Sequence, residues 1–229
     1  MSQTIETRKI HALLPWNWTL RFRLRVSIVS LLMVYGFGIL GMFTPYKPWF
    51  VSMTPVSLLL SYGLLWWNHP YGNAGSWIFG LLAFCIGYFA EVLGVNTGFP
   101  FGVYQYGQVL GPQLWNTPLI IGMNWTIVCY TSNELADRLA PKGTRVAWLL
   151  LGAALLSTLL DVLIEPVAIE LGYWSWAQGT PPLQNYLGWF AVSWLIAVSY
   201  RNWMPTGMRN PLSLWLLGLQ WIFFIALNM

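Results

Sequence analysis

Residues 145–166 read RVAWLLLGAALLSTLLDVLIEP, and this stretch decides the fold class. After Arg145 it contains no charged residue until Asp161. A helix needs about 20 predominantly apolar residues to cross the hydrocarbon core of a bilayer. A membrane β-barrel would instead show short segments of alternating hydrophobicity. The stretch therefore predicts a membrane-spanning helix.

The rest of the chain repeats this pattern. Hydrophobic residues make up 57% of the 229 residues and charged residues 8%, whereas soluble domains carry roughly 25% charged residues. The sequence predicts an all-α, polytopic membrane helix bundle with about seven transmembrane helices, in a single domain over residues 26–229. The apolar runs are 26–43, 49–67, 75–94, 116–136, 145–166, 186–201 and 211–228.

Basic residues predict the orientation of this bundle. With seven spans and a cytoplasmic N-terminus, Lys47 is the only Lys or Arg expected outside, and all the others fall inside. Cytoplasmic loops carry such an excess of Lys and Arg. Residues 1–25 are polar and basic, and contain Trp16 and Trp18, so we expect a cytoplasmic segment at the headgroups and no signal peptide. The predicted location is the cell (inner) membrane, as a multi-pass protein.

Two loops on the outer side are long and carry no Lys or Arg. Residues 95–115 and 167–185 are rich in Gly, Pro and aromatic residues, and we expect them to fold onto the outer membrane face as lids. Asn96 and Thr97 favour a non-helical turn there. Pro166 is expected to kink or end the fifth span. On the inner side, Glu134 and Asp137 are expected on a solvated face beside Arg138.

Three carboxylates stand apart from every basic residue in the sequence. Glu91 lies near the outer end of the third span, and Asp161 and Glu165 lie four residues apart near the outer end of the fifth, on one helix face. Acids within a membrane are costly and mark function by default. We expect an uncharged carboxylic acid facing an apolar cavity, which is a proton donor. The alternative is a hydrogen-bonded cluster that only locks the two spans together.

Polar and aromatic residues of the outer loops are candidates for positioning substrate or water near these acids. Aromatic faces can also stabilise a carbocation, although the favoured role of any single aromatic is packing. The candidates are Asn96, Thr97, Tyr104, Tyr106, Trp174, Trp176 and Asn185.

Several of these motifs occur together in one known family. Residues 91–106 read EVLGVNTGFPFGVYQY, and Asp161-x-x-x-Glu165-Pro166, Gly172-Tyr-Trp-x-Trp176 and Asn185-Tyr-x-Gly-Trp-Phe190 follow in order. This set, over roughly residues 80–195, resembles the carotenoid biosynthesis membrane proteins that include carotenoid 1,2-hydratases and bisanhydrobacterioruberin hydratase. Glu165 stands where many relatives carry Asp, which changes the reach of the carboxyl group.

The resemblance implies a hydratase that adds water across a terminal isoprenoid double bond of an acyclic or monocyclic carotenoid. Protonation gives a tertiary cation, and water then captures it. We expect Glu91, Asp161 and Glu165 to be catalytic, with Asp161 and Glu165 supplying the proton and Glu91 positioning or activating the water. The reverse assignment of the two roles stays open. The expected partners are the carotenoid, membrane lipid and other carotenoid biosynthesis enzymes, without nucleic acid.

No cofactor or metal ion is expected. The two histidines, His11 and His69, are far apart in the sequence, whereas a non-haem iron hydroxylase needs clustered histidine ligands. Three alternatives remain open. A carotenoid cyclase starts from the same protonation but excludes water. A transporter would use the acids as relay groups. A non-catalytic assembly partner would not depend on them.

Overall fold

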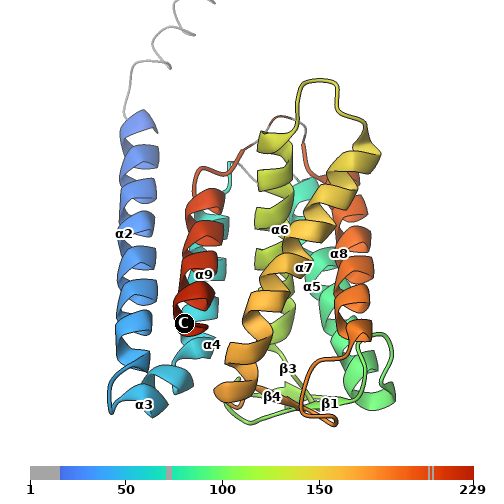
Figure 1. The fold of residues 1–229 in the computed structure, drawn as a ribbon. Helices are drawn as coiled ribbons and strands as arrows, with labels where there is room; N and C mark the ends of the chain where they lie inside the picture. Colours follow the sequence, from blue (N-terminus) through green and yellow to red (C-terminus); the bar gives the residue numbers. More distant parts are fainter. Residues whose placement is uncertain (1–15, 71–73, 206, 208) are drawn as a thin grey trace, which may run out of the picture.

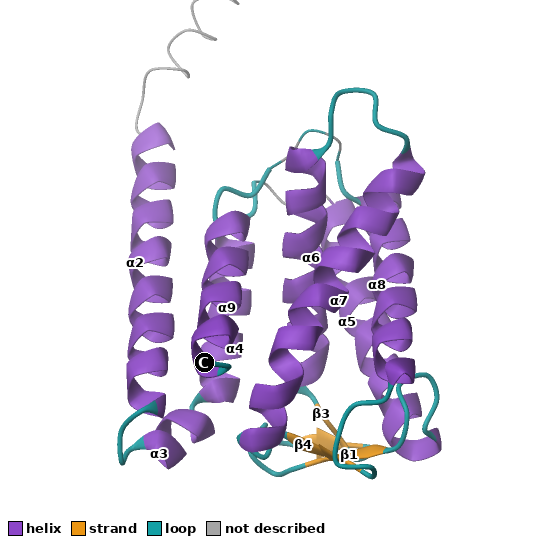
Figure 2. Ribbon diagram, in the orientation of Figure 1, coloured by secondary structure: helices purple, strands orange, loops and turns teal. Residues whose placement is uncertain are grey.

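The apolar runs form the helices of one bundle, described by a computed structural model over residues 16–70, 74–205, 207 and 209–229. Within these residues the fold is all-α apart from four short strands (Figure 2). The helices are α2 (Trp16–Met42), α3 (Lys47–Ser52), α4 (Thr54–Trp67), α5 (Ala74–Thr97), α6 (Ile120–Leu139), α7 (Val146–Glu170), α8 (Leu183–Trp203) and α9 (Ser213–Leu227).

Four of these helices make the centre of the bundle. Helices α5, α6, α7 and α8 pack against one another, and α4 and α9 pack on α6. Helix α2 packs mainly on α9 and stands at the edge of the bundle in Figure 1. Three segments are long and apolar enough to cross a membrane, namely Leu20–Met42, Ala74–Thr97 and Val146–Glu170, and Ser213–Leu227 is a shorter apolar helix.

The two ends of the bundle differ in composition. The start of α2 and the α6–α7 and α8–α9 connections lie at one end (Figure 1). We call it the basic end, because its connections and helix termini carry Arg138, Lys142, Arg145, Arg201 and Arg209. The opposite end, with α3 and the strands, is the sheet end (Figure 2).

The expected lids of the sheet end contain regular structure. Strand β1 (Tyr104–Tyr106) pairs antiparallel with β4 (Trp174–Trp176), and β2 (Gln113–Leu114) pairs with β3 (Thr117–Pro118). The first pair joins the two long outer loops, although about 70 residues separate Tyr104 from Trp174 in the chain. The loops therefore form one cap, held by backbone hydrogen bonds.

Several helix ends differ from the predicted ones. The run 49–67 is divided at Met53 into α3 and α4, and each of these helices has a proline in its first turn, where a missing N–H costs nothing. Helix α2 begins at Trp16, within the expected surface segment, whose residues 1–15 lie outside the described part of the chain.

Two predictions about helix termination are wrong. Asn96 and Thr97 are helical, because α5 continues to Gly98, whose φ of 76° is the left-handed conformation that ends helices. Pro166 lies inside α7, which continues to Glu170, so an end of the helix at Pro166 is wrong, while the alternative of a kink stays a prediction. This extra turn places Glu165 on regular helix, where its side chain keeps the i, i+4 relation to Asp161.

Candidate active site

The three isolated carboxylates meet at the sheet end of the bundle. Glu91 of α5 and Asp161 and Glu165 of α7 are 5%, 0% and 2% exposed, and all three line one pocket. The pocket has a volume of about 20 Å³. A water molecule requires roughly 10–15 Å³ measured in this way, so the space between the acids fits a single water.

Strand β1 supplies hydroxyl donors to Glu91. Successive residues of a strand point to opposite faces, so Tyr104 and Tyr106 point the same way while Gln105 is exposed to the other side. Both tyrosine hydroxyls donate to Glu91 Oε2, the bond from Tyr106 being 2.7 Å. Burial and the neighbouring Glu91 raise the pKa of both tyrosines well above the ordinary value, so these hydroxyls keep their protons and remain donors.

Strand β4 does the same for Glu165. Trp174 and Trp176 lie opposite Tyr106 and Tyr104 in the β1–β4 register, so their side chains reach the same face of the sheet. Their indole nitrogens donate to Glu165 Oε2 at 3.0 and 2.8 Å. The two-stranded sheet is thus a clamp, with one strand bonded to each of two carboxyl groups on different helices.

Asn185 links the two acids of α7. It lies in the first turn of α8 and is 2% exposed. Its Nδ2 donates to Asp161 Oδ2 at 2.9 Å and to Glu165 Oε1 at 3.1 Å. The second oxygen, Asp161 Oδ1, is buried and has no hydrogen-bond partner among the described residues. Asp161 is therefore the least satisfied carboxyl group of the cluster.

No cation compensates these acids within residues 16–70, 74–205, 207 and 209–229. The ion pairs formed there are Lys47–Glu170, Arg138–Glu134 and Arg201–Asp137, and none includes a residue of the pocket. Several uncompensated buried charges would cost several kcal/mol each. The arrangement therefore favours sharing protons among the three carboxyl groups, with tyrosine, tryptophan and asparagine donors around them.

Two of the predicted positioning residues lie away from the pocket. The Asn96 amide donates to Val92 O and Trp115 O, and Thr97 Oγ1 donates to Leu93 O at 2.6 Å. Both side chains secure the end of α5 and its loop. The other five candidates (Tyr104, Tyr106, Trp174, Trp176 and Asn185) all line the pocket.

The structure adds a tryptophan that the sequence pattern did not single out. Trp125 of α6 is fully buried and donates from Nε1 to Glu91 Oε1 at 2.9 Å. Its ring stacks on Trp189 of α8 with centroids 3.7 Å apart. It also requires Gly87, because a Cβ there would lie 2.3 Å from the ring. Trp125 lies in an ordinary apolar run, so only the packing of α5 on α6 reveals it.

Most of the chain matches a known protein family. Residues 50–229 match the family described as carotenoid biosynthesis protein. The chain belongs to this family. The resemblance predicted from the motifs is thereby confirmed, and the matched region contains every residue of the pocket.

A curated relative of this carotenoid biosynthesis protein matches over a shorter stretch. Bisanhydrobacterioruberin hydratase from Haloarcula japonica is 30% identical over 115 residues, which covers 44% of this chain and 36% of that protein. The match thus spans about a third of the relative's length. No solved structure matches the chain. Membership of the family and its apolar helices indicate a membrane-associated protein.

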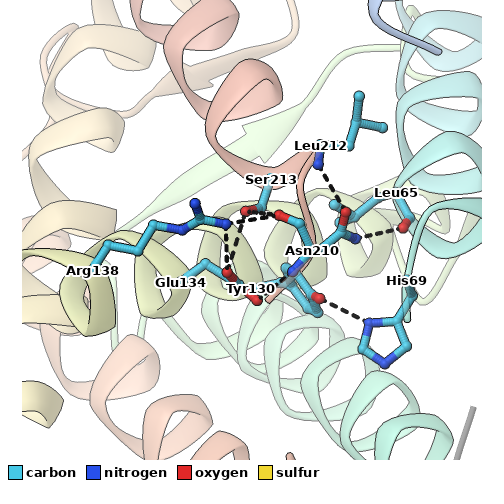
Figure 3. A network of polar contacts seen from close by, with 8 residues as sticks. All are labelled: Leu65, His69, Tyr130, Glu134, Arg138, Asn210, Leu212 and Ser213. Carbon is cyan, nitrogen blue, oxygen red and sulfur yellow. Dashed lines mark hydrogen bonds and ion pairs between the residues drawn. The ribbon is translucent and has the colours of Figure 1, made fainter. Parts of the chain in front are cut away.

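This family member has a second buried polar network, at the basic end (Figure 3). Glu134 is 1% exposed, so the prediction of a solvated face is wrong for it. It accepts hydrogen bonds from the Asn210 backbone N–H at 3.0 Å and from Arg138 at 3.3 Å, and Arg138 also bonds the Asn210 carbonyl. Figure 3 shows these groups converging on the loop before α9, which folds back over α6.

Proposed function

We propose that this chain is a carotenoid hydratase, which adds water across a terminal isoprenoid double bond. One observation carries the proposal: three buried carboxyl groups with unequal hydrogen-bond partners surround a space for one water. Hydration needs a proton for one carbon of the alkene and a water oxygen for the other. Membership of the carotenoid biosynthesis family and similarity to a protein named as a hydratase support the choice of substrate.

Asp161 is the proton donor in this mechanism. Its Oδ1 is the one carboxyl oxygen of the pocket that has no hydrogen-bond partner among the described residues, so no competing hydrogen bond holds a proton there. The proton moves to the less substituted carbon while the π electrons form the new C–H bond. The other carbon becomes a tertiary cation. Positioned proton transfer of this type contributes typically 10²–10⁴-fold to rate.

The cation forms at the edge of the pocket, beside its aromatic rings and carboxylate oxygens. Phe101, Trp174, Trp176 and Trp189 line the pocket, and ring faces attract cations. Glu165, fixed by two indole N–H groups and Asn185, supplies preorganised negative potential. These groups lower the barrier because their positions are set before the charge develops.

Glu91 activates the water. Its carboxylate, held by Tyr104, Tyr106 and Trp125, lines the same pocket as Asp161. Water adds its oxygen to the cation, and the released proton goes to Glu91. The product is a tertiary alcohol, one water heavier than the alkene. A proton then returns from Glu91 to Asp161 across the pocket, which restores the starting state.

We also propose the placement of the protein in the membrane. The chain crosses the cell (inner) membrane several times, with its basic end in the cytoplasm, because Lys and Arg concentrate at that end. The acids then lie in the outer half of the bilayer. Attachment of an impermeant thiol reagent to single cysteines placed at the 142–144 and 177–180 turns tests this orientation, since only the second site should react from outside.

Isotope labelling tests the hydration itself. The chain is expressed in cells that make an acyclic carotenoid, grown in ordinary and in oxygen-18 water, and the products are analysed by mass. We expect a product heavier by one water per modified end, with its oxygen taken from water. A product of unchanged mass would identify a cyclase, and a label only from oxygen gas would exclude hydration. An Asp161→Asn variant should form no hydrated product.

A further inference from the structure

A large apolar cavity adjoins the acid pocket and plays no part in the mechanism above. It has a volume of about 430 Å³, within the roughly 300–1,000 Å³ typical of small-molecule sites. It lies between α2, α3, α4 and α9, in the half of the bundle toward the sheet end. We call it the tail cavity, and its walls include Phe37, Gly38, Phe50, Leu58, Phe223 and Phe224.

The tail cavity and the acid pocket share a boundary. Ile121, Asn124 and Trp174 line both spaces. Ile164, which precedes Glu165 on α7, also lines the tail cavity. Trp174 faces both, because its indole nitrogen is bonded to Glu165 while its ring forms part of the apolar wall. An apolar molecule in the cavity therefore ends beside the carboxyl groups.

The acid pocket and the tail cavity differ in volume, and this difference assigns one reactant to each of them. The space among the acids accommodates a water but no isoprenoid group. The alkene must therefore approach from the apolar side, where the walls offer many aromatic faces and few polar atoms. Flat rings pack well against a planar conjugated chain. Asn124 brings an amide to the boundary, where it makes no hydrogen bond to another described residue and can meet the water.

We propose that the tail cavity binds the conjugated chain of a linear isoprenoid polyene, with the terminal double bond at Asn124 and Trp174. This inference rests on the proposed hydration for the identity of its occupant. It assigns substrate recognition to α2 and α9, which contribute no residue to the acid pocket. It also explains how a substrate far longer than the pocket reaches a site closed by the β1–β4 clamp.

Two glycines of α2 provide a matched test. Gly38 lines the cavity, and a Cβ there would lie 3.2 Å from Phe223, so Gly38→Leu places its side chain against the cavity wall. Gly36 has no heavy atom within 4 Å of the same position and does not line the cavity. Binding of an acyclic forty-carbon polyene to purified protein in lipid nanodiscs is followed by the absorbance shift and induced circular dichroism of the polyene.

We expect Gly38→Leu to weaken polyene binding about tenfold or more, as a mismatch of a few methylenes in an apolar site does. Gly36→Leu should bind as the unchanged chain does. Equal binding by both variants would overturn the tail site, and so would equally strong competition by a saturated acyl chain. Should Gly38→Leu fail to fold, Ser57→Phe in the cavity wall and Leu59→Phe on the exposed face of α4 make the same comparison.

Binding and hydration are read separately. The same measurement on Asp161→Asn, which should bind polyene but not convert it, isolates the tail site from the chemistry. Polyene binding that depends on Gly38 without any hydration by the unchanged chain would retain the tail site and reject the hydratase. Hydration that does not depend on Gly38 would retain the hydratase and reject the tail site.

Discussion

The two ends of this bundle bury acidic residues in opposite ways. At the basic end, Glu134 is bonded to Arg138, Ser213 and the Asn210 backbone. At the sheet end, Asp161 and Glu165 have only neutral donors beside them, and they line a pocket that adjoins the tail cavity at Ile121, Asn124 and Trp174. Burial alone therefore does not distinguish the acids proposed to be catalytic from a structural one.

The difference lies in what compensates the carboxyl group. Glu134 is compensated by a fixed cation and a backbone donor, so it ties α6 to the loop before α9 (Figure 3). The pocket acids have neutral donors that hold their positions, and the proposed hydration requires protons to move among them. A group must exchange protons to catalyse hydration, and a permanent arginine partner would prevent this. The following predictions test whether the distinction holds.

The largest expected effect is loss of hydration in Asp161→Asn. The amide keeps the shape of the side chain but cannot give up a proton, so turnover should fall about 10²–10⁴-fold. Asp137→Asn is the matched control at the basic end, where the carboxylate pairs with Arg201. This control should keep turnover within about twofold of the unchanged chain, far from the decrease of at least ~10²-fold expected for Asp161→Asn. The measurement is the amount of product formed per folded protein, determined by chromatography. Activity in Asp161→Asn equal to that of the unchanged chain would show that Asp161 is not the proton donor.

At the basic end, loss of an acid should lower the stability of the protein. Glu134→Gln leaves Arg138 without its partner beside a buried loop, and losing one member of a buried pair costs about 3 kcal/mol. Glu165→Gln should cost less, because it removes no ion pair, yet it should lower turnover. Unfolding midpoints of both variants in detergent test this. A more stable Glu134→Gln, or a Glu165→Gln that is the less stable of the two, would contradict the comparison.

The third prediction concerns pH at the basic end. His69, bonded to Tyr130 and Ser76 in the loop after α4, has its pKa lowered from 6.5 to about 4 by burial. The folded protein therefore binds fewer protons here than the unfolded chain. Its contribution is present above about pH 6.5 and is lost as the pH falls toward 4, by on the order of 2 kcal/mol.

The measurement is the unfolding midpoint between pH 7 and pH 4.5, compared with His69→Gln. The variant cannot gain this proton, so its stability should change less over the interval. Identical slopes for the two proteins would show that His69 does not titrate in this range.

The smallest expected effect separates two tyrosines. Tyr106→Phe removes one of three donors to Glu91, and a hydrogen bond of about 1 kcal/mol corresponds to several-fold lower turnover. Tyr130→Phe removes the contact with His69 at the basic end and should leave turnover unchanged. Kinetics at saturating carotenoid measure both. A decrease in Tyr130→Phe equal to that in Tyr106→Phe would mean that the variants act through stability alone.

Much of the candidate site could be predicted from local sequence. Asp161 and Glu165 share a face because helical geometry fixes residues four apart, and the absence of nearby Lys or Arg already separated them from Glu134. The Tyr-x-Tyr pattern indicated polar groups near the acids, and the Trp-x-Trp pattern indicated aromatic faces. The structure shows that both pairs donate hydrogen bonds to the acids. Asn96 and Thr97, by contrast, were assigned by proximity to Glu91 in the chain, and the helix carries their side chains to its exposed end.

By itself the sequence indicated a lipid environment, the helices and the end of the bundle where the acids lie. These follow from apolar runs, helical spacing and charge, which are local or additive properties. Only the tertiary structure decided that β1 pairs with β4, that Trp125 reaches Glu91, that Asn210 covers Glu134 and that a tail cavity meets the acids. Each of these depends on segments distant in the chain packing together, and no local pattern encodes which surfaces will meet.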